Sequence, residues 1–200
     1  MLYYEKKLQK QGCDLIIGVD EAGRGPLAGP VVAAAVALKT TRFSNRIDDS
    51  KKLTAVLRNK AFPEIIRKSI FGFGIVDEKA IDRINILEAT RVAMQQAISS
   101  LKAKLDPGQY KHIHVIVDGN MALELEWPCT DIIGGDAKSK SIASASILAK
   151  VIRDQIMLYY DSIYPEYGFS KNKGYPTKEH RDILKKIGPS LIHRKSFVCV

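Results

Sequence analysis

The sequence predicts an α/β domain with a mixed sheet, followed by a smaller helical region. Three apolar runs of strand length come early in the chain, at residues 15–19, 31–38 and 69–76. Further strand-like runs at 112–117 and 130–133 alternate with longer helical segments, an order typical of α/β domains. We expect residues 1–160 to form the core domain. Residues 161–200 should form a helical part packed on it, so that the chain is one compact unit.

Four segments carry the signals of helices. Residues 54–67 begin at a potential N-cap, Thr54, and contain Pro63, which we expect to kink or break the helix. The remaining helices are expected at 81–105, where apolar side chains recur at near-helical spacing, at 141–160, which begins with small side chains, and at 177–187, capped by Thr177.

The charge of the chain points to a polyanionic partner. Its 31 lysines and arginines exceed its 22 aspartates and glutamates, giving a net charge of +9. Residues 171–195 hold eight of the basic side chains and only two acidic ones, Glu179 and Asp182, with glycine and tyrosine between them. A solvated helix face would explain this composition. A nucleic-acid-binding surface explains it better, and we expect one here.

The cysteine content and hydropathy indicate a cytoplasmic protein. The three cysteines, Cys13, Cys129 and Cys199, are odd in number and form no CxxC pair, which argues against a disulfide scaffold or a zinc site. Residues 1–11 are polar and charged, unlike a secretory leader. The longest apolar stretch, residues 30–38, is too short to span a membrane. We therefore expect no membrane association.

Acidic residues follow three of the apolar runs. Asp20 and Glu21 end the first run, Asp118 ends the fourth, and Asp136 follows the fifth. Ligands gather at the carboxyl ends of strands in open α/β sheets, so these carboxylates should converge if the strands are parallel neighbours. Clustered carboxylates repel one another unless cations bind, and oxygen ligands suit Mg²⁺ or Mn²⁺. Two such ions about 3.5–4 Å apart would support phosphodiester hydrolysis.

The adjacency of Asp20 and Glu21 sets a condition on this site. Neighbouring strand residues point to opposite faces of a sheet. The two acids can share a site only if the strand ends at Asp20 and the turn at residues 22–25 redirects Glu21. Asp136 has a second interpretation, because an acid just before a helix can simply be its cap.

The loop after the first two acids suits a phosphate-bearing ligand. Gly23 and Gly25 lack a Cβ and so allow close approach to the backbone, while Arg24 carries a planar guanidinium suited to phosphate. The segment thus combines metal ligands, backbone donors and an anion partner.

These residues stand in motifs that resemble one family over nearly the whole chain. The sequence is similar to ribonuclease H type 2, the bacterial ribonuclease HII family. The motifs that carry the resemblance are GVDEAGRGPLAGPVV (18–32), DSKKL (49–53), IDRINIL (81–87), VDGN (117–120), GGDAKS (134–139), SASILAKV (144–151), GYPTKEH (174–180) and HRKSF (193–197). Their number, order and spacing make coincidence untenable.

The resemblance implies a fold and an activity. The fold would be the ribonuclease H fold, with a five-stranded mixed sheet flanked by helices and a helical, substrate-binding C-terminal part. The enzyme would cleave the RNA strand of RNA–DNA hybrids and nick duplex DNA 5′ to embedded ribonucleotides, leaving 3′-hydroxyl and 5′-phosphate ends. Its role would be ribonucleotide excision and RNA primer removal. A monomer is expected, and the sequence does not indicate which proteins, if any, bind the enzyme.

The resemblance also assigns roles to residues. It places the catalytic, metal-binding acids at Asp20, Glu21, Asp118 and Asp136. The backbone of Gly23, Arg24 and Gly25 would sense the 2′-hydroxyl, the group that distinguishes RNA from DNA. Tyr175 would pack on the sugar beside the ribonucleotide and help to recognise the RNA-to-DNA junction. Lys51, Lys52 and Asn85 are expected contacts to the substrate backbone, although a solvated surface residue is the default for each.

The sequence departs from the family pattern at two positions. Pro176 stands where a small residue is expected, and Lys195 stands where arginine is frequent.

Other functions fit the sequence less well. A type 3 ribonuclease H shares the acids but normally carries an extra N-terminal domain. A junction resolvase has no need of the glycine pair with Tyr175. A nucleotide-binding switch would need a phosphate loop, and a binding protein without catalysis leaves the acids unexplained.

Overall fold

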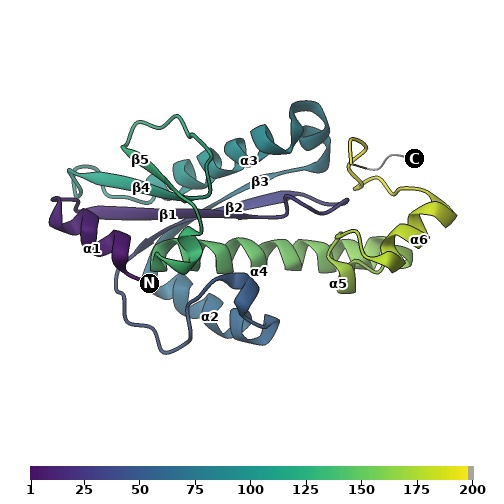
Figure 1. The fold of residues 1–200 in the computed structure, drawn as a ribbon, viewed down its shortest axis with the longest axis horizontal. Helices are drawn as coiled ribbons and strands as arrows, with labels where there is room; N and C mark the ends of the chain where they lie inside the picture. The colour runs from purple at the N-terminus through teal and green to yellow at the C-terminus, as the bar shows by residue number, and fades with distance from the viewer. Residues whose placement is uncertain (198–200) are drawn as a thin grey trace.

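The computed structural model describes residues 1–197, so Cys199 lies outside the described residues. Five strands form one mixed sheet in the order β3-β2-β1-β4-β5 (Figure 1). β1 pairs antiparallel with β2, and β2 antiparallel with β3, while β4 lies parallel to β1 and β5 parallel to β4. The predicted fold class is therefore confirmed. The strands are β1 (Leu15–Ala22), β2 (Val31–Leu38), β3 (Ser69–Val76), β4 (Ile113–Asp118) and β5 (Cys129–Ile132).

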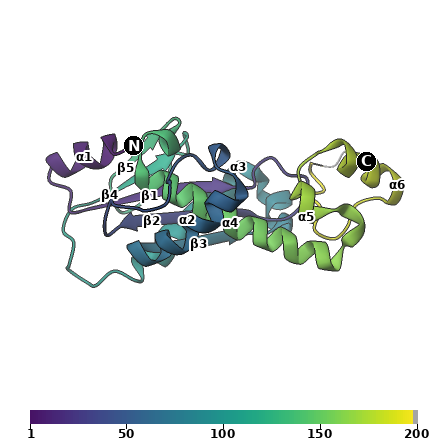
Figure 2. The same ribbon diagram turned by 90° about the horizontal axis from the view of Figure 1, so that it is seen from below.

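Helices cover both faces of the sheet. α3 packs on one face, and α2 and α4 lie on the other (Figures 1 and 2). The helices are α1 (Tyr3–Lys10), α2 (Ala55–Lys68), α3 (Glu78–Lys102), α4 (Lys140–Ile163), α5 (Phe169–Asn172) and α6 (Lys178–Ile187), with short 3₁₀ turns η1 (Ser50–Lys52), η2 (Gly135–Ala137) and η3 (Pro165–Tyr167). In residues 1–197, no helix is long and apolar enough to cross a membrane.

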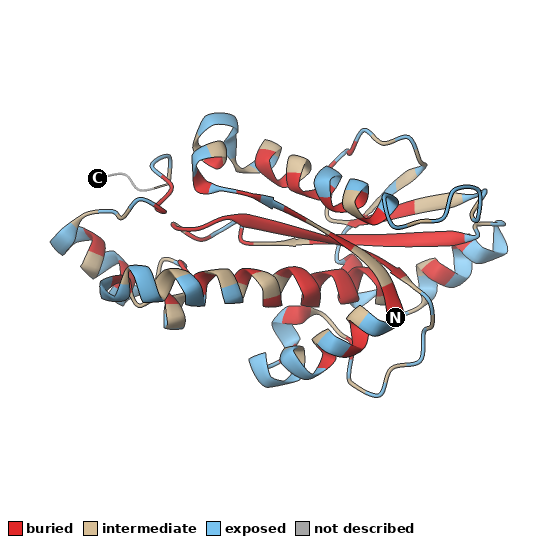
Figure 3. Ribbon diagram, turned by 180° about the vertical axis from the view of Figure 1, so that it is seen from behind, coloured by how far each residue is buried: buried red, intermediate tan, exposed pale blue. Residues whose placement is uncertain are grey.

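Strand β1 is buried on both faces, and its alternation decides which side chains meet which helix (Figure 3). Ile17 and Val19 belong to the hydrophobic cluster beneath α3. Gly18 faces α4, where a Cβ would lie only 2.3 Å from the carbonyl carbon of Ser141. The close approach of α4 to β1 therefore depends on the absence of a side chain at Gly18.

Helix α2 corrects one prediction and confirms another. Thr54 caps it, because its Oγ1 accepts a hydrogen bond from the Leu57 amide. The predicted break at Pro63 is wrong, since the helix runs on to Lys68. The residues after the proline are fixed by tertiary contacts. Ile65 is fully buried against α4, and Glu64 accepts hydrogen bonds from a distant loop at residues 44–45.

Helix α3 is not the continuous helix that the apolar spacing predicted. It spans residues 78–102 and is interrupted at Asn85, where φ is 63° and ψ is 166°. The Asn85 side chain accepts hydrogen bonds from the amides of Leu87 and Glu88, which caps the longer, second piece. α1 was not predicted either. It is held by Glu5, which accepts hydrogen bonds from Ser139 and Ser141 at the start of α4.

Helix α4 extends beyond the sheet and carries the C-terminal elements (Figure 1). The predicted domain boundary at residue 160 lies inside this helix, which ends at Ile163. Met157 packs with Ala28, Phe169, Leu184 and Ile192 in a separate hydrophobic cluster. This cluster joins the loop after β1 to the last part of the chain, and so places the C-terminal residues beside the carboxyl end of β1.

Candidate active site

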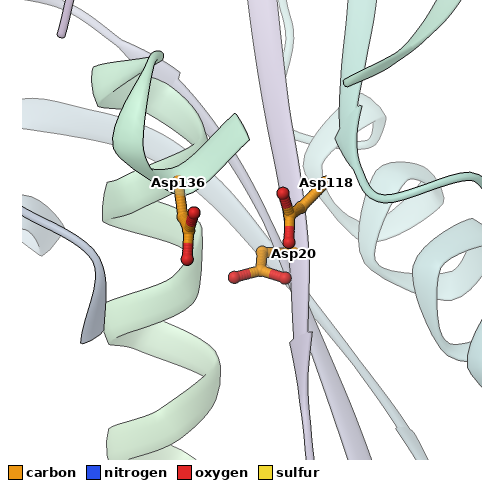
Figure 4. Close-up of side chains that lie close together, drawn as sticks. All are labelled: Asp20, Asp118 and Asp136. Atoms are coloured by element: carbon orange, nitrogen blue, oxygen red, sulfur yellow. The ribbon is translucent and has the colours of Figure 1, made fainter. Parts of the chain in front are cut away.

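Three of the predicted acids lie together at one end of the sheet. Asp20, Asp118 and Asp136 each offer a carboxylate oxygen, and these oxygens all lie within 4.8 Å of one another (Figure 4). Asp20 and Asp136 are buried, and Asp118 is half-buried. We call these three residues the carboxylate group. Its members come from β1, β4 and the 3₁₀ turn η2, which are far apart in the sequence.

The sheet register places the first two members side by side. β1 and β4 are parallel, and the last registered pair is Val19 with Val117, so Asp20 and Asp118 follow directly on neighbouring strands. Both valines face α3, and the next residue of each strand therefore faces α4. Asp118 in turn accepts a hydrogen bond of 2.6 Å from the Gly135 amide. That bond draws η2, and with it Asp136, toward the strand ends.

Asp136 does not cap the helix that follows it. The N-cap of α4 is Ser139, whose hydroxyl accepts a hydrogen bond from the Ile142 amide. The simple capping interpretation of Asp136 is therefore wrong, and its carboxylate is free to face the other two acids.

Glu21 lies outside the carboxylate group but beside it. β1 continues to Ala22, so the strand does not end at Asp20 as the predicted geometry required. The Glu21 amide donates to Asp20 Oδ1 at 2.7 Å, and its carboxylate pairs with Arg24 at 3.4 Å. Glu21 and Asp20 nevertheless line the same pocket.

The electrostatics of the site favour a bound cation. Burial raises the pKa of Asp20 well above its usual range, and the charges of Glu21 and Asp118 raise it further. Burial and Asp118 likewise raise the pKa of Asp136. A divalent cation relieves this repulsion, and a set of carboxylate oxygens suits a hard ion such as Mg²⁺ or Mn²⁺. The residues present therefore fit the predicted metal.

Basic and glycine residues line a pocket with Asp20 and Glu21, whereas Asp118 and Asp136 are not among its lining residues. Lys51 lines it, and although burial acts to lower the pKa of Lys51, the charges of Asp20 and Asp136 raise it. The other lining residues, apart from Asp20 and Glu21, are Ala22, Gly23, Arg24, Gly25, Ser50, Arg58, Ser146, Lys150 and Tyr175. Among the described residues, Lys52 and Asn85 do not line it. Lys52 is exposed near Asp49, and Asn85 occupies the break in α3.

Tyr175 forms one wall of the pocket. Its side chain is partly exposed, and the Lys150 ammonium and the Arg153 guanidinium lie 5.8 and 5.7 Å from the ring centroid. Cations at these distances are attracted to an aromatic face. The ring is thus held near two cations of the protein, and its exposed part is accessible to a ligand.

The two glycines of the Gly23-Arg24-Gly25 segment are needed for different reasons. Gly23 has φ of +101°, and a Cβ there would lie 2.2 Å from Arg153 Nε. Gly25 has an ordinary backbone conformation, and the nearest atom to a Cβ would be Tyr175 Cε1 at 3.9 Å. Gly23 is therefore required by the fold, whereas the folded protein leaves room for a side chain at Gly25.

Two buried arginines that the sequence reasoning missed hold this region. Arg194 donates to the carbonyl oxygens of Gly23, Arg24 and Gly29, at distances from 2.6 to 3.0 Å. Arg153 donates to the carbonyls of Pro30, Ala28 and Lys173. The basic surface expected at residues 171–195 does not include Arg194, because the side chain is fully buried. No sequence signal singles out Arg153, since the same helix also carries the charged residues Lys150 and Asp154 close to it.

This combination of sheet and site defines a class of enzyme. A five-stranded mixed sheet with carboxylates at the ends of adjacent parallel strands is the arrangement of a metal-dependent nuclease with the ribonuclease H fold. Residues 17–200 match the sequence profile of the family described as Ribonuclease HII. The chain therefore belongs to the ribonuclease HII family.

Individual relatives support the assignment. The chain is 49% identical over 195 residues to ribonuclease HII of Moorella thermoacetica. The alignment covers 97% of this chain and 91% of the relative. It is 50% identical over 200 residues to ribonuclease HII of Caldanaerobacter subterraneus, with coverage of 99% and 80%. These matches show a ribonuclease H enzyme that acts on RNA–DNA hybrids, and they favour the type 2 over the type 3 interpretation.

Solved structures show the same fold. Ribonuclease H2 from Pyrococcus horikoshii OT3 aligns with a TM-score of 0.70 and 26% identity, over 91% of this chain and 93% of that one. The Mn²⁺ complex of Bst-RNase HIII aligns with a TM-score of 0.72 at 17% identity, over 92% and 67% of the two chains. At that identity the second likeness supports the fold alone.

Proposed function

We propose that this enzyme, besides cleaving RNA–DNA hybrids, nicks duplex DNA on the 5′ side of a single embedded ribonucleotide. The nick would leave a 3′-hydroxyl and a 5′-phosphate, as ribonucleotide excision and primer removal require. The observation that carries the proposal is that Gly25 and Tyr175 line the same pocket as Asp20 and Glu21. A single pocket is thus lined both by two of the acids and by the groups suited to recognise a sugar.

The acids are proposed as the catalytic, metal-holding residues. Asp20, Asp118 and Asp136 would hold Mg²⁺ or Mn²⁺, with Glu21 as a further ligand and two ions during turnover. Bound ions of this kind supply an activated water and stabilise the leaving oxygen. The chain contributes the alignment, because Asp118 is fixed by the Gly135 amide and Asp20 by the amide of Glu21.

The Gly23-Arg24-Gly25 backbone is proposed to recognise the 2′-hydroxyl. The supporting observation is the open space at Gly25, where the folded protein would tolerate a Cβ. A position that packing leaves free but that carries no side chain suits close approach by a ligand. The Arg194 guanidinium holds the carbonyls of Gly23 and Arg24 from the interior, so this backbone is fixed before substrate arrives.

Tyr175 is proposed to pack against the sugar that follows the ribonucleotide. A ring there accepts a deoxyribose and would clash with an added 2′-hydroxyl, so it selects an RNA-to-DNA junction. Lys51 is proposed as a phosphate contact, supported by its place in the pocket. Lys52 and Asn85 are proposed as more distant contacts to the substrate backbone. The enzyme is further proposed to act as a monomer in the cytoplasm, where the free thiols Cys13 and Cys129 remain reduced.

A nicking assay tests the proposal. The substrate is a DNA duplex with one ribonucleotide, labelled at the 5′ end of the strand that carries it and incubated with Mg²⁺, with Mn²⁺ or with EDTA. The expected product migrates one nucleotide short of the alkaline cleavage product, forms only with metal, and can be resealed by a DNA ligase. An all-DNA duplex is the negative control, and a long RNA–DNA hybrid is the positive control. Cleavage of the hybrid without nicking of the single-ribonucleotide duplex would reject the proposal.

A further inference from the structure

Two histidines outside the pocket form a buried hydrogen-bonded pair. His180 Nε2 lies 3.0 Å from His193 Nε2, and both side chains are almost completely buried. The rings of Tyr167 and Phe169 pack against both imidazoles. Neither histidine touches the carboxylate group, so the proposed chemistry does not use them.

The partners of the pair allow one consistent arrangement of protons. His193 Nδ1 faces the amide of Ser190 at 2.9 Å, and an amide can only donate, so this nitrogen must accept. A neutral His193 then carries its proton on Nε2 and donates it to His180 Nε2. His180 in turn carries its proton on Nδ1 and donates it to the carbonyl oxygen of Tyr175, 2.9 Å away. The chain of bonds therefore runs in one direction and ends on Tyr175.

Backbone hydrogen bonds close this chain into a circuit. The Leu27 amide donates to the carbonyl of Gly174 at 2.8 Å, and the Arg194 amide donates to the carbonyl of Leu27 at 2.8 Å. The loop after Gly25 is thus held between the residue that precedes Tyr175 and the residue that follows His193. The bond between His193 and His180, followed by the bond from His180 to the Tyr175 carbonyl, joins the same two segments a second time. The circuit ties the position of Tyr175 to that of the Gly23-Arg24-Gly25 backbone.

We infer that His180 and His193 are positioning residues that set Tyr175 against the 2′-hydroxyl-sensing backbone and so determine selectivity for an RNA-to-DNA junction. The inference rests on the function proposed above for Tyr175 and the glycine backbone. Two recognition groups that read neighbouring sugars must keep a fixed separation, because small displacements at a site cost much of its activity. The histidine bond adds a side-chain constraint on that separation. Burial, which lowers the pKa of both imidazoles, keeps them neutral as the arrangement requires.

The first test reads the protons directly. Long-range ¹H–¹⁵N spectra of the imidazoles at neutral pH should show His193 protonated on Nε2 and His180 on Nδ1, with neither ring charged. The exposed His112 serves as an internal reference for a ring in exchange with solvent. A charged ring, or the opposite tautomer at either position, would overturn the circuit whatever the activity of the enzyme.

The second test compares variants on two substrates, the single-ribonucleotide duplex and the long hybrid. His180→Phe keeps an aromatic ring but removes both hydrogen bonds, whereas His180→Asn keeps an N–H for the Tyr175 carbonyl. We expect His180→Phe to lower the ratio of the nicking rate on the single-ribonucleotide duplex to the cleavage rate on the long hybrid by about tenfold. This is the scale for loss of a buried hydrogen bond. His180→Asn should stay within about twofold of the parent. If His180→Phe fails to fold, His193→Phe, which removes the donor to His180 Nε2, is the second variant and should lower the same ratio to a similar extent.

Combining variants separates this inference from the function on which it rests. With Tyr175→Ala already in place, His180→Phe should change the ratio no further, because its effect passes through Tyr175. A selective loss in Tyr175→Ala without one in His180→Phe would overturn the inference and leave the proposed function intact. Equal losses on both substrates in Tyr175→Ala would overturn the role proposed for Tyr175 and the inference with it.

Discussion

The Gly135 amide donates a hydrogen bond of 2.6 Å to Asp118 Oδ1. This bond joins the end of β4 to the turn that carries Asp136, so one carboxylate fixes the placement of the next. It also occupies one lone pair of Asp118 and directs the remaining oxygen sites toward Asp20 and Asp136. The carboxylate group is therefore held by the backbone, against the mutual repulsion of its members.

Asp118→Asn should abolish cleavage without unfolding the protein. The amide oxygen can still accept from Gly135, but the negative charge is gone, so we expect activity to fall at least about a hundredfold, as for loss of an electrostatic catalytic group. Removing one of three repelling charges should raise the Tm measured in EDTA. The additional stabilisation by Mg²⁺ should shrink. Normal turnover by this variant would remove Asp118 from the site.

Gly25→Ala and Gly23→Ala should separate recognition from folding. Gly25→Ala meets no atom closer than 3.9 Å, so the free energy of unfolding should stay nearly unchanged while single-ribonucleotide nicking falls about tenfold or more. Gly23→Ala forces a positive φ and a clash with Arg153, and should cost roughly 2 to 4 kcal/mol. Urea unfolding and the nicking assay measure the two effects. Full activity in Gly25→Ala would contradict the close approach of substrate there.

Tyr175→Ala should impair the nick at a single ribonucleotide more than the cleavage of a long hybrid. The side chain is 39% exposed, so stability should change little, while the contact to the sugar is lost. Tyr175→Phe is the matched control, because it keeps the ring. We expect it to retain most of the selectivity, as measured by kcat/KM on both substrates.

Arg194→Lys should destabilise the protein despite keeping the charge. The guanidinium forks to three carbonyls, and a single ammonium cannot replace that geometry. We expect a loss of roughly 2 to 4 kcal/mol in the free energy of unfolding, since buried acceptors are left unpaired. Arg181→Lys, at an exposed position of α6, is the control and should be neutral. Equal stability of the two variants would show that the buried bonds contribute little.

The free energy of unfolding should fall between pH 6.5 and pH 4 by an amount that depends on His193. Burial, with a smaller contribution from His180, lowers the pKa of His193 to about 4 from its ordinary 6.5. A depressed histidine pKa means that the unfolded chain takes up protons first, so this stability is present above pH 6.5 and is lost as pH falls toward 4. The loss would amount to at most about 3 kcal/mol.

The same pH range contains an opposing contribution. Asp20, Glu21 and Asp136 have raised pKa values in the folded protein. Such acids make the folded protein more stable relative to the unfolded chain as pH falls. The wild-type curve alone is therefore ambiguous. The difference between the wild-type protein and His193→Gln, measured by urea unfolding across this range, isolates the histidine component. A difference that does not vary with pH would refute it.

Much of the fold could be predicted because its signals are local. The five strands begin or end within a few residues of the apolar runs, and Thr54 and Thr177 cap helices as their residue type suggested. The break at Asn85 could not be predicted, because apolar spacing continues across it. Pro63 misled for the opposite reason, since burial of the following residues holds a helix that the local rule would interrupt.

The sequence by itself determined the order of the five strands and the four longest helices, the acids at the strand ends, the glycine segment and the resemblance to ribonuclease HII. Only the tertiary structure decided that three acids form a group with Glu21 beside it, that Arg194 lies inside, and that His180 bonds to His193. The physical reason is the separation along the chain. Arg194 finds its acceptors 165 to 171 positions away. No local pattern of side chains records where such a partner lies, because long-range packing alone brings the two together.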